Sequence, residues 1–136
     1  HGREHSFPTR RSSDLLATAP QIKSKQELVS ELLRREELMS TAIGRGIAIP
    51  HVRLSSVTDL VAAVGVSQVD IQDFASFDDS PVRILFMIAA AYNQHAYYLQ
   101  TLSYFSARFK SQELRESVLA AGSTERVYEL LTKAEE

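Results

Sequence analysis

His51 stands at the end of a short apolar run, Ile47–Ile49, which is closed by Pro50 and has the look of a buried strand. Proline fixes φ and cannot donate to a strand ladder, so we expect the strand to end where the imidazole begins. Two glycines, Gly44 and Gly46, precede the run and allow another molecule to approach the backbone closely. An imidazole at such a place is suited to chemistry near neutral pH. A surface histidine after an ordinary turn is the alternative, and the wider pattern must decide between them.

The wider pattern consists of three ordered blocks. In chain order the first block is Arg35-Glu36, Ser40-Thr41, Ile43-Gly44 and Gly46–His51. The second is Asp79–Val82 with Ile84–Ala90, and the third is Leu99–Ser103. Together they resemble the signature of the IIA domains of the fructose/mannitol class in the bacterial phosphoenolpyruvate-dependent sugar phosphotransferase system, whose relatives include nitrogen-regulatory proteins. The resemblance covers roughly residues 24–133 without an obvious gap.

The resemblance implies an α/β fold in which helices flank a mixed β-sheet. It implies a phosphotransferase component that carries phosphate on a histidine in the cytoplasm, with no cofactor. The partners implied are the histidine phosphocarrier protein as donor and a IIB domain as acceptor. A membrane IIC component would take part indirectly in sugar uptake, and the chain itself would neither insert into the membrane nor bind nucleic acid.

The resemblance also assigns roles to individual residues. His51 would be the phosphoryl acceptor and Arg35, sixteen residues earlier, the active-site arginine. A planar guanidinium can hold phosphate through two parallel hydrogen bonds, which a lysine cannot do. Ser40, Gly44 and Gly46 are expected to support the phosphate in a loop, the glycines through their backbone amides. A solvated helix end is the alternative reading of Arg35.

The resemblance implies a second active-site histidine forty-seven residues after the acceptor, where this chain has Tyr98. His95 lies one helical turn earlier on nearly the same face. Either His95 has taken over the role or the role is lost. A tyrosine can donate a hydrogen bond but carries no positive charge near neutral pH. We expect one of these two side chains to point toward the His51 ring.

Two further functions remain open. A regulatory domain of this fold would control its partners through its phosphorylation state and modify no sugar, and the altered position 98 favours this somewhat. A degenerate domain would transfer no phosphate, but the presence of Arg35 and His51 argues against it. A metal enzyme is disfavoured, because His51 and His95, the histidines after residue 15, are far apart in the sequence. No carboxylates cluster near them in the sequence.

The elements that must position these residues follow from the apolar spacing. Ser24 and Glu27 have the spacing of a capping box, and Gly122 is suited to end a helix. The final helix would be capped by Ser123 or Thr124. Helices are predicted over about Lys25–Arg35, from Gln94 through Phe109, over Gln112–Ala121 and after Thr124, with strands at Ile47–Ile49, Leu60–Val66 and Val82–Ala90.

Composition sets the remaining limits. A chain of 136 residues with 44% hydrophobic residues is suited to one domain with one core. No cysteine is present, and the net charge of −2 leaves no basic surface typical of nucleic-acid binding. Residues 1–15 resemble the translation of a sequencing adapter, so we assign the domain to residues 16–136. We expect it to lack its native N-terminal strand and helix.

Overall fold

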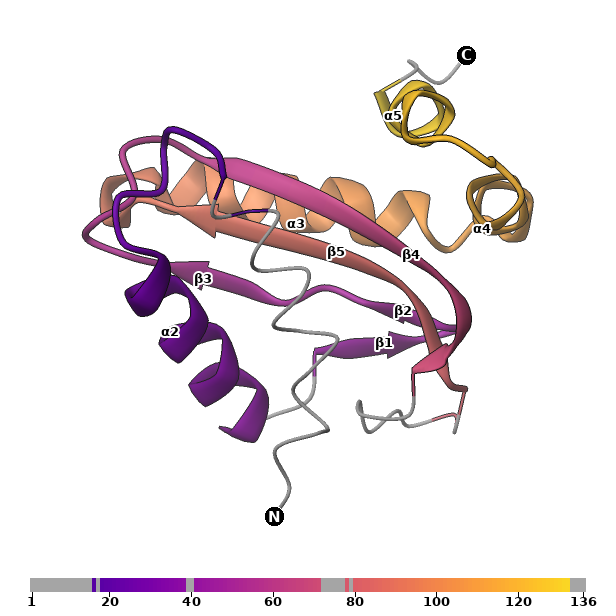
Figure 1. Ribbon diagram of the computed structural model, residues 1–136, viewed down its shortest axis with the longest axis horizontal. Coiled ribbons are helices and arrows are strands. Elements are labelled where there is room, and N and C mark those ends of the chain that lie inside the picture. The colour runs from indigo at the N-terminus through magenta and orange to yellow at the C-terminus, as the bar shows by residue number, and fades with distance from the viewer. Residues whose placement is uncertain (1–15, 17, 39–40, 72–77, 79, 133–136) are drawn as a thin grey trace.

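The computed structural model describes residues 16, 18–38, 41–71, 78 and 80–132, and the segment 1–15 lies outside them. Within the described part, five strands form one mixed sheet with helices on both of its faces (Figure 1). The α/β architecture expected from the sequence is therefore confirmed.

The sheet is organised around strand β5, Val82–Ala90, whose predicted bounds are confirmed. Eight of its nine residues are buried, because the strand is covered on both faces. Strand β4, Val61–Ile71, runs antiparallel along one edge of β5 and extends beyond the predicted Leu60–Val66. Two short strands run parallel to β5 along its other edge.

These two strands, β2 (Ile47–Ala48) and β3 (His51–Arg53), follow one another in the same register. Ile47 pairs with Ile84 and His51 pairs with Ile88, so the offset along β5 does not change across Pro50. The predicted strand therefore ends before Pro50, as β2, but the second strand that begins at His51 was not predicted. Proline interrupts the ladder for two residues, and pairing resumes at the imidazole because the carbonyl of Pro50 still accepts a hydrogen bond from the Ile88 N–H, at 3.0 Å.

Strand β1, Ala42–Gly44, was not predicted and pairs antiparallel with β2 through a tight turn. The turn contains three successive positive φ angles, at Gly44 (89°), Arg45 (59°) and Gly46 (83°), which explains the two glycines. The carbonyl of Gly46 accepts hydrogen bonds from the first amides of β5, at Arg83 and Ile84. The turn is thereby fixed at the beginning of β5.

The helices form two layers (Figure 1). Helix α2, Lys25–Leu38, covers one face of the sheet, where Leu28 and Leu32 pack in a cluster with Met87 and Ala89. The opposite face is covered by α3 (His95–Arg108), α4 (Gln112–Leu119) and α5 (Thr124–Thr132). None of the helices in the described part is long and apolar enough to cross a membrane.

The helix ends explain small differences from the predicted bounds. Helix α2 continues one turn past Arg35, and Ser24 caps it by accepting a hydrogen bond from the Glu27 N–H at 3.1 Å. The Glu27 carboxylate accepts from the Ser56 hydroxyl, which ties the helix start to the loop after β3. Ser123 caps α5 by accepting from the Arg126 N–H at 3.1 Å.

Candidate functional site

His51 lies half-buried at the first position of β3. Its Nδ1 lies 2.7 Å from the carbonyl oxygen of Ile49. That carbonyl falls in the interrupted part of the strand, between Ala48 and His51, and so takes no part in the register of the ladder. A carbonyl oxygen can only accept, so Nδ1 carries the proton and the ring presents Nε2 as its lone-pair nitrogen.

Arg35 meets this second nitrogen from the other layer of the fold. Its Nη2 lies 3.4 Å from His51 Nε2, although α2 and the face occupied by His51 are on opposite sides of the sheet. A guanidinium can only donate, which agrees with an unprotonated Nε2. The structure therefore brings the two predicted catalytic residues together at the outer edge of β3.

The surroundings of His51 favour its neutral form. Burial lowers the pKa of the ring below its usual 6.5, and the nearby charge of Arg35 lowers it further. The hydrogen bond to the Ile49 carbonyl and the charge of Glu36 act in the opposite direction and are outweighed. At neutral pH the ring is therefore an uncharged nucleophile with a fixed tautomer.

Of the two candidates Tyr98 and His95, Tyr98 is the one that reaches the His51 ring. It lies in the first turn of α3. Its ring centroid lies 5.8 Å from that of His51, and only 8% of its surface is exposed. Burial raises the pKa of its hydroxyl to about 12, so Tyr98 remains protonated and neutral. His95 is exposed, and within the described residues no ring contact or hydrogen bond joins it to His51.

Glu36 and Thr41 fix the end of α2 beside the ring, and neither was assigned a role from the sequence. Thr41, which is buried, donates from its hydroxyl to Glu36 at 2.6 Å and from its backbone N–H at 3.2 Å. These bonds connect the last turns of α2 to the beginning of β1. Arg35 therefore lies in the part of α2 whose C-terminal end is fixed to β1 by these hydrogen bonds.

Arg53 is a further residue that sequence reasoning missed. It lies two positions after His51 on β3, hence on the same face of the sheet. Its guanidinium carbon lies 5.8 Å from the ring centroid of Tyr98 and 5.8 Å from that of Tyr92. The period-two spacing of a strand would have identified it, had a second strand been predicted from His51 onward.

The expected glycine support is not at the ring. Gly44 and Gly46 form the turn at the beginning of β5, whereas His51 pairs further along the same strand. Five steps of extended chain separate Gly46 from His51, which corresponds to about 16 Å. The glycines serve the hairpin turn, and their amides cannot reach a group on His51. Ser40 lies outside the described residues.

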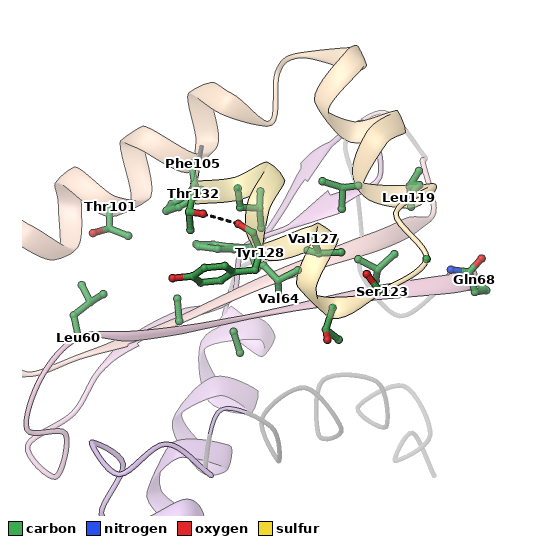
Figure 2. Close-up of a pocket in the computed structure, with 18 of the residues that line it drawn as sticks. Leu60, Val64, Gln68, Thr101, Phe105, Leu119, Ser123, Val127, Tyr128 and Thr132 are labelled. Carbon is green, nitrogen blue, oxygen red and sulfur yellow. Dashed lines mark hydrogen bonds between the residues drawn. The ribbon is translucent and has the colours of Figure 1, made fainter. Parts of the chain in front are cut away.

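The candidate site is also separate from a cavity on the helical face of the sheet. A cavity of about 660 Å³ lies between β4 and helices α3–α5. Figure 2 shows Val127 and Tyr128 of α5 facing Val64 of β4, with Leu60 and Gln68 toward its two ends. Neither His51 nor Arg35 lines it. Among the described residues no three His, Cys, Asp or Glu side chains are grouped to hold a metal ion.

Comparison with known sequences identifies relatives. Residues 10–134 match a family model described as phosphoenolpyruvate-dependent sugar phosphotransferase system, EIIA 2. A nitrogen regulatory protein of Klebsiella oxytoca is 37% identical over 114 residues, which cover 82% of this chain and 68% of that protein. The fructose-specific EIIABC component of Bacillus subtilis is 34% identical over 119 residues, 88% of this chain. The matched region spans only 19% of that longer protein.

Solved structures have the same fold. The nitrogen regulatory protein IIA-Ntr of Neisseria meningitidis superposes with a TM-score of 0.82 at 29% identity, covering 90% of this chain and 83% of that one. The Escherichia coli mannitol enzyme IIA, solved in complex with phosphorylated enzyme IIB, gives 0.76 at 22% identity, covering 93% of this chain and 86% of that one.

Proposed function

Because the chain belongs to the EIIA 2 family of the phosphoenolpyruvate-dependent sugar phosphotransferase system, we propose that it carries a phosphoryl group on Nε2 of His51. The proposed donor is the histidine phosphocarrier protein. The proposed acceptor is a IIB domain, which would serve sugar uptake through a membrane IIC component, so the reaction would take place in the cytoplasm. The observation that carries the proposal is the neutral His51 ring, with Nδ1 bound to Ile49 and Nε2 facing Arg35.

In the forward step, the lone pair of His51 Nε2 attacks the phosphorus of the donor phosphohistidine. A P–N bond forms at Nε2, the donor's P–N bond breaks, and its electron pair returns to the donor imidazole. The second step repeats this exchange with the nucleophile of the acceptor. Because the phosphoryl group is largely transferred as a loose, metaphosphate-like unit, rate depends mainly on positioning and charge.

Two contacts of the unphosphorylated site are placed to stabilise the charges that develop on the ring and on the phosphoryl oxygens during transfer. As Nε2 bonds to phosphorus, the ring becomes positive, and the Ile49 carbonyl at Nδ1 stabilises that charge. The phosphoryl oxygens arrive where the Arg35 guanidinium already lies, 3.4 Å from Nε2, and replace the ring nitrogen as its hydrogen-bond acceptor. The Tyr98 hydroxyl, being protonated, offers a further donor from α3.

The direct test is phosphorylation of the full chain by phosphoenolpyruvate, the first phosphotransferase enzyme and the histidine phosphocarrier. We expect one acid-labile phosphoryl group per chain, and a phosphorus–nitrogen coupling in NMR that places it on Nε2 of His51. Label that is acid-stable, or that resides on another residue, would contradict the proposal. Transfer of the label to a fructose-type IIB domain tests the second half of the reaction.

The rate of phosphoryl acceptance should fall as pH decreases, with a midpoint below 6.5. Burial and Arg35 lower the pKa of His51, so the nucleophilic lone pair is present above that pKa and is occupied by a proton below it. The rate should be level above pH 7. An NMR titration of the His51 ring locates the midpoint independently of the donor, whose own histidine also titrates. A midpoint above 6.5 would contradict the argument.

A regulatory role is the second candidate, because a nitrogen regulatory protein matches this chain at 37% identity. In that role phosphorylation of His51 would alter partner binding and no IIB domain would be needed. The two are separated by a chase experiment. A phosphorylated chain that gives its label to a IIB domain supports transport. A chain that keeps its label in the presence of the IIB domains encoded beside it supports regulation.

A further inference from the structure

Arg53 is held beside the proposed phosphoryl acceptor by two aromatic rings. Its guanidinium lies within cation–π distance of Tyr98 and of Tyr92, at 5.8 Å from each ring centroid. Tyr98 in turn contacts the His51 ring at 5.8 Å. His51 and Arg53 project from the same face of β3, and Tyr98 of α3 lies against both.

Among the described residues, no carboxylate neutralises the charge of Arg53. No ion pair joins Arg53 to an acidic side chain within the described residues. The tyrosine rings orient the guanidinium without forming strong hydrogen bonds to its N–H groups, and the side chain is half-buried. An oriented, partly desolvated cation whose donors remain available is suited to bind an anion.

Both arginines converge on the same tyrosine. Arg53 and Arg35 each lower the pKa of Tyr98, against the larger raising effect of burial, so both guanidinium groups lie within electrostatic reach of its hydroxyl. Arg35 also contacts His51 Nε2 directly. Arg35 reaches this space from α2 and Arg53 from β3, so they approach it from two different elements of the fold.

We propose that Arg53 is a second phosphate-binding cation of this site, held over Tyr98 and Tyr92 so that it meets the phosphoryl oxygens opposite Arg35. The inference rests on the proposed function and adds a residue to it. Tyr98, being neutral, cannot supply positive charge, and Arg53 supplies it. Arg53 forms no covalent bond in the reaction and contributes charge-assisted hydrogen bonds to the oxygens as the group moves between nitrogens.

The experiment measures phosphoryl transfer from the phosphorylated histidine phosphocarrier to the full chain. Arg53→Gln should lower kcat/KM by about tenfold to a hundredfold, the loss expected for one charge-assisted contact. Arg53→Lys should lie between this variant and the wild type, because it retains the charge without the planar stack. Arg126→Gln, which removes an exposed charge from α5, is the matched control and should leave the rate unchanged. Thermal midpoints show whether each variant is folded.

A rescue experiment separates charge from structure. Tyr98→His added to Arg53→Gln should recover transfer at pH 6 and lose it again toward pH 8, because an imidazolium replaces the missing cation only while it is protonated. A wild-type rate for Arg53→Gln would overturn the inference and leave the phosphorylation of His51 standing. It would also be overturned if Arg53→Lys were as slow as Arg53→Gln and the double variant were not rescued at either pH. Absence of label on the wild-type chain would refute the proposed function itself.

Discussion

Replacing His51 with glutamine is expected to abolish acid-labile phosphorylation, lowering the rate of labelling by on the order of a thousandfold or more. A glutamine amide can still donate a hydrogen bond to the Ile49 carbonyl, but it offers no nucleophilic nitrogen in place of Nε2. The fold should persist, because the half-buried side chain at this position keeps a similar length. Transfer of labelled phosphate from phosphoenolpyruvate, followed by acid treatment, measures the loss.

His95→Gln is the matched control for this variant. His95 is exposed at the first turn of α3, one turn before Tyr98, so its replacement removes a nearby imidazole without touching the site. Labelling should continue at the wild-type rate. Label that survives in His51→Gln, or that disappears in His95→Gln, would move the acceptor to a different residue.

Arg35→Lys is expected to reduce the rate of phosphoryl transfer by about a hundredfold to a thousandfold, the range measured for removing one preorganised donor. Lysine keeps the charge but has a single ammonium in place of the planar fork that faces Nε2. The effect should be mainly on kcat, because the contact with the phosphoryl oxygens is strongest while the group is in transit. Pre-steady-state transfer from the phosphorylated donor measures it.

The neighbouring residue provides the control for Arg35. Arg34 is exposed and pairs with Glu31 on its own helix, at 2.9 Å. Arg34→Gln removes the same charge one residue away and should change the rate by no more than about threefold, as for a surface ion pair. Equal losses in both variants would mean that the general charge of α2, and not the position of Arg35, assists transfer.

Much of the framework could be predicted because its signals are local. The run Val82–Ala90, apolar except for Arg83, has the length and composition of a strand buried on both faces, and β5 has these bounds. The helical spacing of Tyr98, Leu102 and Phe105 predicts the buried face of α3, and it also places Tyr98 on the sheet side.

The parts that were missed depend on pairing between distant segments. Pro50 ends a strand when only local propensity is considered, but pairing with β5 resumes after the proline in the same register and forms β3. Because β3 was not predicted, Arg53 was not assigned to the face of His51. The glycines near His51 in sequence were assigned to the phosphate, whereas strand geometry moves them to the other end of the sheet.

The three side chains of the candidate site, Arg35, Tyr98 and His51, belong to three different parts of the fold. Arg35 comes from the helix on one face, Tyr98 from the helix on the other, and His51 from the sheet between them. Tyr98 follows His51 by 47 residues, so these groups meet only after long-range pairing is complete. A nascent chain that has not yet released α3 from the ribosome has the histidine but not the site. Under the proposed function, full-rate labelling of His51 is therefore expected only on chains in which α3 has packed against β3, so labelling can time this step during synthesis.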